Sequence, residues 1–90
     1  MQETQDPFYT MRKRLQWRAS HRGIKEMDIL VGGFAIQRLP FMSKDELVCF
    51  ADILDIPDQD LLSWLTNQSE VPVELHSPLL AEMLQYRPLS

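Results

Sequence analysis

The side chains best suited to chemistry in this chain are one cysteine and two histidines, and their spacing does not indicate a catalytic or metal-binding set. Cys49 lies in the apolar run 47–50, and neither His21 nor His76 is close to it in sequence, so no thiolate–imidazole pair is predicted. Two histidines this far apart, without ligating neighbours, lack the spacing of zinc ligands. No glycine-rich nucleotide loop is present. We therefore expect no enzymatic activity, no metal site and no stably bound cofactor.

A second group of chemically capable residues is the segment Arg22-Gly23-x-x-Glu26. Its structural interpretation is a helix–helix corner, in which Gly23 makes the turn and Arg22 pairs with Glu26. Its functional interpretation is a recognition patch. There, Gly23 lets a partner approach the backbone, Arg22 donates a planar bidentate contact, and Glu26 adds an acceptor one turn further on. The functional interpretation predicts that all three residues are accessible to solvent.

Further residues near this segment complete a candidate partner-binding site. Trp17 lies among arginines, and for it we weigh packing against the following helix against an exposed role at an interface. The full set of candidate partner-binding residues is Trp17, Arg18, Arg22, Gly23, Glu26 and Asp28.

Helical periodicity in every segment predicts the elements that position these residues, and no strand is indicated. The caps expected for four of the helices are Asp6, Ser43 (in a capping box with Glu46), Asp58 and Ser77. The five helices are expected at about 7–22, 24–39, 44–54, 58–65 and 77–86.

The apolar faces of these helices predict a compact all-α bundle of five helices, which forms a single domain over residues 1–90 with flexible ends at 1–5 and 87–90. Trp64 lies on the apolar face of the fourth helix, so we expect it in the core. Gly32 and Gly33 lie in the middle of the second helix, where they predict either a bend or a close contact between helices.

The charge of the chain is distributed unevenly. The net charge is −4, but residues 1–25 carry six basic and two acidic residues, or +4, whereas the remainder carries three basic and eleven acidic residues, or −8. This two-ended arrangement suits an oriented contact between proteins. We expect the bundle to be a monomer. The main alternative is a helix-turn-helix protein that binds nucleic acid, which the acidic remainder disfavours and a continuous basic groove would support. An enzyme subunit is the third interpretation, and it would need an apolar pocket with convergent polar groups.

The sequence also bears on the compartment. Cys49 is the only cysteine, so one chain cannot form a disulfide, and its apolar neighbours favour a buried thiol in a reducing compartment. No apolar run reaches the length of about 18 residues that crosses a membrane. Residues 1–6 are polar and acidic, unlike a signal or transit peptide. We expect the protein in the cytoplasm of a bacterium, or in the mitochondrial matrix of a eukaryote.

Two blocks of the sequence resemble the succinate dehydrogenase assembly factors that promote flavinylation. The first is Arg22-Gly23-x-x-Glu26, followed by Asp28 and Leu30, and the second runs from Phe50 through Asp58 and Asp60 to Trp64-Leu65. Together they extend over residues 12–66. The chain departs from the family pattern at two positions. His21 replaces a frequent arginine, which would lower the constant charge of the contact or make it depend on pH. Gln59 replaces a usual proline, which should affect only capping.

The resemblance implies a specific function. Members of this family bind the FAD-containing subunit of succinate dehydrogenase, and in bacteria also that of fumarate reductase. They assist formation of the covalent bond between FAD and a histidine of that subunit. By this resemblance the chain is an assembly factor that holds no cofactor of its own and acts on FAD inside its client.

Overall fold

The computed structural model describes residues 6–88, which form five α-helices and two short 3-10 helices and contain no strand. The α-helices are α1 (Tyr9–Ser20), α2 (Lys25–Arg38), α3 (Lys44–Leu54), α4 (Asp58–Leu65) and α5 (Pro78–Gln85), and the 3-10 helices are η1 (Leu39–Phe41) and η2 (Val73–Leu75). The predicted all-α fold is confirmed. In the part of the chain that the structure describes, no helix is both long and apolar enough to cross a membrane.

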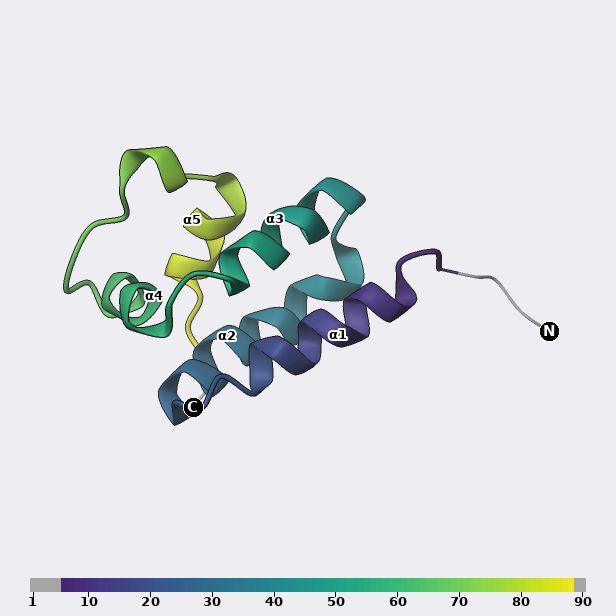
Figure 1. Cartoon of the computed structure of the whole chain (residues 1–90), viewed down its shortest axis with the longest axis horizontal. Coiled ribbons are helices and arrows are strands. Elements are labelled where there is room, and N and C mark those ends of the chain that lie inside the picture. The colour runs from purple at the N-terminus through teal and green to yellow at the C-terminus, as the bar shows by residue number, and fades with distance from the viewer. Residues whose placement is uncertain (1–5, 89–90) are drawn as a thin grey trace.

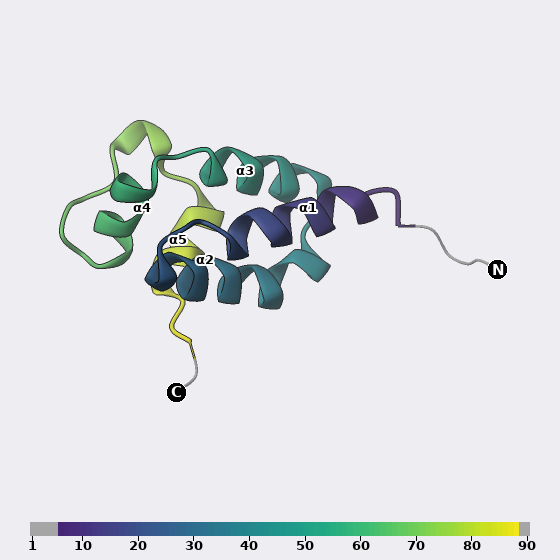
Figure 2. The same ribbon diagram turned by 60° about the horizontal axis from the view of Figure 1, so that its bottom comes forward.

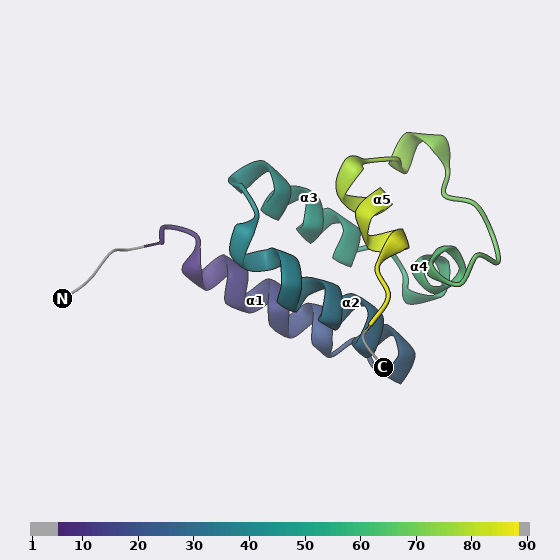
Figure 3. The ribbon, with the colours of Figure 1, turned by 180° about the vertical axis from the view of Figure 1, so that it is seen from behind.

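The helices form a hairpin with three further helices placed on it. In Figure 1, α1 and α2 run side by side in opposite directions, and α3 lies along the same hairpin. In the turned view of Figure 2, α1 is seen between α3 and α2, and it makes contacts with both of them. In Figure 3, α5 lies beside α3 and near α4, at the end of the molecule where the α1–α2 corner is also found.

One hydrophobic core joins all five α-helices. Its fully buried large side chains include Met27, Leu47, Phe50, Leu61 and Met83, which come from four different helices. The helix α1 adds buried Leu15 and Ala19, and the predicted core position of Trp64 is confirmed because the residue is only 8% exposed. Each large apolar side chain buried in this way stabilises the fold by roughly 1.5–3 kcal/mol.

Two of the four predicted N-caps are present. Ser43 accepts a hydrogen bond from the Glu46 backbone N–H at 3.2 Å, while the Glu46 carboxylate accepts from the Ser43 N–H at 3.0 Å, so the capping box is complete. Ser77 caps α5 by accepting from the Leu80 N–H at 3.1 Å. Both caps satisfy backbone donors that the first helical turn leaves without partners.

The other two predictions of N-caps are wrong. The first helix begins at Tyr9 after Phe8, because Asp6 instead forms a turn in which its carboxylate accepts from the Phe8 N–H at 2.9 Å and pairs with Arg12. Asp58 is the first residue inside α4, preceded by Pro57 in the cap position, and its carboxylate makes no cap bond. An arginine from another part of the chain binds that carboxylate instead.

Of the two interpretations of the glycine pair, close contact between elements is confirmed. A Cβ atom added at Gly32 would lie 3.2 Å from the Cα of Ser20, so α1 and α2 approach here to a distance that a side chain would prevent. At Gly33 the same atom would lie 2.5 Å from the Tyr86 hydroxyl, because that side chain covers the helix at this point. The helix α2 continues through both glycines from Lys25 to Arg38.

The ends of the chain were expected to be flexible. Residues 1–5 and 89–90 lie outside the described residues. Arg87 lies two residues beyond the end of α5 and donates a hydrogen bond to the Leu84 carbonyl at 3.0 Å. Cys49 was predicted as a buried thiol; it is half-buried and packs against the core, with its thiol 3.7 Å from the Ser77 hydroxyl.

Candidate partner-binding site

The corner between α1 and α2 spans residues 21–24 and is built around Gly23. The backbone of Gly23 has a φ of +92°, in the left-handed region that residues with a side chain rarely adopt. A Cβ atom added there would meet nothing within 4 Å, so the glycine opens toward solvent. This confirms the predicted turn and leaves the backbone open to close approach.

Arg22 points inward, and the prediction that its side chain is accessible to solvent is wrong. Its side chain is only 8% exposed. The guanidinium Nε donates to the Asp58 carboxylate at 2.7 Å, and Nη2 lies 2.5 Å from the same oxygen. Nη1 donates to the Leu54 carbonyl at 2.7 Å, and Nη2 also donates to the Ile56 carbonyl at 3.1 Å.

The inward direction of Arg22 has a clear physical cause. Leu54 is the last residue of α3, where backbone carbonyls lose their partners inside the helix. The planar guanidinium donates to that carbonyl and to the Ile56 carbonyl in the following turn, while the Asp58 carboxylate balances its positive charge. The predicted pair between Arg22 and Glu26 does not form, because Asp58 takes the place of Glu26 as the anionic partner.

Asp28 also acts inside the corner. Its carboxylate accepts a hydrogen bond from the Arg22 backbone N–H at 2.6 Å. Asp28 lies in the first turn of α2, where a negative charge is also stabilised by the helix dipole. The corner is therefore fixed through both the backbone and the side chain of Arg22.

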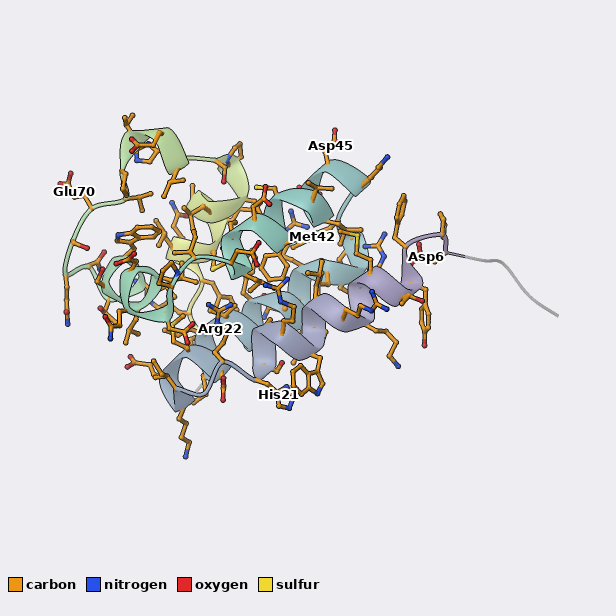
Figure 4. The ribbon with its side chains drawn as sticks, viewed as in Figure 1. Asp6, His21, Arg22, Met42, Asp45 and Glu70 are labelled. Atoms are coloured by element: carbon orange, nitrogen blue, oxygen red, sulfur yellow. The ribbon has the colours of Figure 1, made fainter. Side chains whose placement is uncertain are left out.

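The outer side of the corner carries exposed groups. Glu26 is exposed, as predicted. Trp17 is 62% exposed and stacks on the His21 ring, with centroids 4.2 Å apart and planes 11° from parallel, so the interpretation that packs Trp17 against α2 is wrong. Arg18 is partly exposed and pairs with Asp55 at 2.6 Å. Figure 4 shows the division, with Arg22 directed toward the segment between α3 and α4 and His21 directed outward.

A small hollow lies beside the corner. It has a volume of about 240 Å³ and is lined by Trp17, Arg18, His21, Arg22 and Asp58. It suits the docking of a partner's side chain against an aromatic wall and polar edges. Among residues 6–88, no three histidine, cysteine, aspartate or glutamate side chains gather as a metal site.

Asp58 is the member of this site that sequence reasoning missed as part of the corner. Its position before an apolar helical run indicated a cap, and no local pattern links it to a residue 36 positions earlier. The structure brings together Arg22, Gly23, Asp28 and Asp58, with Trp17, Arg18 and Glu26 around them.

Comparison with known proteins shows the family to which the chain belongs. The model of a protein family described as "Flavinator of succinate dehydrogenase" matches residues 13–87. The chain belongs to this family. All of the candidate site residues lie within the matched region, and the resemblance seen in the sequence is confirmed.

Individual relatives of this flavinator family agree. The "FAD assembly factor SdhE" of Acetobacter pasteurianus is 38% identical over 81 residues, which cover 90% of this chain and 74% of the relative. A "Succinate dehydrogenase assembly factor 2, mitochondrial" of Dictyostelium discoideum is 31% identical over 70 residues, covering 78% of this chain and 50% of the relative. The protein of that name in Saccharomyces cerevisiae is 32% identical over 88 residues, which cover 94% of this chain and 54% of the relative. The chain thus spans about half the length of these two mitochondrial relatives.

Family membership favours the assembly-factor interpretation over nucleic-acid binding. The arrangement of charges agrees. Arg12, Arg18, Arg22 and Arg38 each pair with a carboxylate of the chain itself, so fewer cations remain for phosphate groups.

Proposed function

We propose that this chain binds the flavoprotein subunit of succinate dehydrogenase and promotes covalent attachment of FAD to that subunit. The observation that carries the proposal is the family match over residues 13–87, which contains the whole corner. Both kinds of relative described above are named as assembly factors, one for FAD and the other for succinate dehydrogenase. A fumarate reductase flavoprotein is a second client of the same chemistry.

The chain works as a binding protein and not as a catalyst. The corner offers an open glycine backbone, an exposed aromatic ring and an exposed carboxylate, whereas Arg22 and Asp58 neutralise each other. A binding protein accelerates a client's reaction by favouring the reactive arrangement of that client, which requires a difference in affinity between the two arrangements. The covalent bond then forms by the flavoprotein's own chemistry, and FAD stays in the client.

The contact surface consists of the outward side of the corner. Gly23 receives the client backbone, Glu26 accepts hydrogen bonds from it, and Trp17 with Arg18 borders the hollow that takes a client side chain. Asp28 contributes from inside by holding the Arg22 backbone. One copy of the chain acts on one client, in the bacterial cytoplasm or in the mitochondrial matrix.

The proposal is tested by producing the flavoprotein subunit with and without this chain and then denaturing it. Covalent flavin survives denaturation, so the fluorescence of the client band in a gel measures attachment. The proposal predicts strong fluorescence only when the chain is present. Equal fluorescence in both samples, with the chain folded and in excess, would overturn it.

A further inference from the structure

The contacts of Arg22 point to a role different from direct recognition. We propose that Arg22 and Asp58 form a buried clamp that positions the corner, and that the hydrogen-bond donors of Arg22 hold this clamp instead of recognising the client. Asp58 is thereby a positioning residue of the site. This inference rests on the proposed function, because the corner is taken as the surface that binds the flavoprotein.

The donors of Arg22 are already committed within the chain. Each of its three guanidinium nitrogens donates to an acceptor of the α3–α4 segment: Nε to the Asp58 carboxylate, Nη1 to the Leu54 carbonyl and Nη2 to the Ile56 carbonyl. A planar group with this many fixed donors is geometrically suited to joining two segments. Turning it toward a partner would leave two carbonyls and one carboxylate without their donors.

Burial points to the same role. The Arg22 side chain is 8% exposed and that of Asp58 is 27% exposed, so the pair is largely removed from solvent. The Arg18–Asp55 pair on the same side of the molecule is much more open, with exposures of 41% and 70%. A partner therefore meets Arg18 readily, whereas the hydrogen-bond donors of Arg22 become available to it only after the clamp has opened.

The clamp also determines where Gly23 lies. Arg22 precedes Gly23 directly, and its backbone N–H is held by Asp28 while its side chain is held by Asp58. The left-handed backbone of Gly23 thus starts from a residue fixed to both α2 and the start of α4. Loss of either end of the clamp should release the corner and disturb the approach of a client to Gly23.

Replacement of Asp58 distinguishes the clamp from direct recognition. If Arg22 contacted the client, Asp58→Asn would free the guanidinium and preserve or strengthen binding. If Arg22 acts through the clamp, Asp58→Asn removes the charge that holds it, and binding weakens as it does in Arg22→Gln. Because both residues belong to one device, the double variant should lose little more than either single variant.

The experiment compares wild type, Arg22→Gln, Asp58→Asn, the double variant and Asp58→Glu, which keeps the charge. Asp60→Asn is the matched control, because Asp60 lies in the same helical turn, is exposed and forms no ion pair with a described residue. Affinity for the purified flavoprotein is measured by titration, after a thermal melt confirms that each variant is folded. The amide signal of Gly23 in a ¹H–¹⁵N spectrum gives a second readout, and it is easy to assign because the chain has only three glycines.

We expect each single clamp variant to weaken client binding by about tenfold or more. The double variant should bind no more than about twofold more weakly than the weaker of the two single variants. Asp58→Glu should recover part of the affinity, and Asp60→Asn should bind like wild type. The Gly23 signal should move in the clamp variants, while those of Gly32 and Gly33 stay in place.

The clamp would be overturned if folded Asp58→Asn binds the client strongly while Arg22→Gln does not bind it. That result would make Arg22 a direct contact of the client. A Gly23 signal that does not move in either variant would also overturn it. If wild type itself fails to bind the flavoprotein, the proposed function fails, and the Gly23 signal then decides on the clamp independently.

Discussion

At the scale of single residues, the corner assigns different tasks to neighbours in the chain. Gly23 supplies a left-handed backbone and an open surface, Arg22 holds the corner from inside, and Glu26 remains free on the outside. The residue types alone predicted the turn at Gly23, because few residues tolerate that backbone. They did not predict the burial of Arg22, because its acceptors belong to a segment more than 30 positions away.

Two replacements of Gly23 distinguish the effect of backbone strain on stability from steric obstruction of a partner. Gly23→Ala and Gly23→Arg should both lower the free energy of unfolding by about 1–2 kcal/mol, since both place a side chain on a left-handed backbone. The added Cβ itself meets no atom of the chain within 4 Å, so the alanine variant is free of steric clash. Urea denaturation checks the stability of the two variants.

Only Gly23→Arg should also abolish client binding, because only its long side chain blocks close approach to the backbone. The alanine variant is the matched control for strain. If folded Gly23→Ala loses client binding as completely as Gly23→Arg, binding depends on the backbone conformation at Gly23 and not on the absence of a long side chain there.

The two tryptophans should respond in opposite ways to replacement. Trp64 is buried and packs in the core, so Trp64→Ala should lower the free energy of unfolding by about 3–5 kcal/mol. Trp17 is 62% exposed, so Trp17→Ala should change the free energy of unfolding by no more than about 0.5 kcal/mol. Trp17→Ala should instead weaken client binding by more than about 1 kcal/mol, as expected for an aromatic anchor at an interface. A Trp17→Ala protein with normal affinity for the flavoprotein would remove Trp17 from the contact surface.

At the scale of elements, caps could be predicted where the acceptor and the donor are local. Ser43 and Ser77 each accept a hydrogen bond from the backbone N–H three residues further on, and neither hydroxyl is bound by a charged side chain of the described residues. Asp6 and Asp58 had equally suitable types, but each carboxylate found an arginine, Arg12 in one case and Arg22 in the other. A charged donor binds a carboxylate more strongly than a neutral backbone N–H does.

The capping box of α3 should make stability depend on pH. The hydrogen bond from the Ser43 backbone, helped by Arg38, lowers the pKa of Glu46 below its ordinary value of 4.5. A lowered carboxyl pKa contributes stability above the ordinary value, and this contribution is lost as the pH falls through the pKa of the folded state. Glu46→Gln should therefore melt below wild type at neutral pH, and the gap should close as the pH falls below 4.5 and through the lowered pKa of Glu46 in the folded protein.

The measurement is a series of thermal melts of both proteins across pH. Glu70→Gln is the control, because Glu70 is exposed in the connection between α4 and α5 and points away from the molecule in Figure 4. It should show no gap at any pH. A gap for Glu46→Gln that stays constant into acid would show that the lost contact, and not the charge, accounts for the difference.

At the scale of the whole molecule, the periodicity of apolar residues was sufficient to predict five helices around one core. The ion pairs between Arg18 and Asp55 and between Arg22 and Asp58 join the basic first hairpin to the acidic α3–α4 segment. Lys13, Arg14 and Lys25 form no ion pair with a described residue, so no carboxylate of that part of the chain neutralises them directly. Which carboxylates neutralise which arginines depends on packing between distant segments, and sequence patterns carry no signal for it.

The central claim is that the outer side of the α1–α2 corner promotes covalent attachment of FAD to the client, and Glu26→Ala tests it most directly. Glu26 is exposed and forms no ion pair with a described residue, so its replacement should leave the free energy of unfolding within about 0.5 kcal/mol. The measurement is in-gel flavin fluorescence of the flavoprotein subunit produced with wild type, Glu26→Ala, the distant control Glu70→Ala, or no added chain. We predict full fluorescence with wild type and Glu70→Ala, and fluorescence near the level without the chain for folded Glu26→Ala. Full fluorescence with folded Glu26→Ala, when absence of the chain abolishes it, would contradict the assignment of the corner as the working surface.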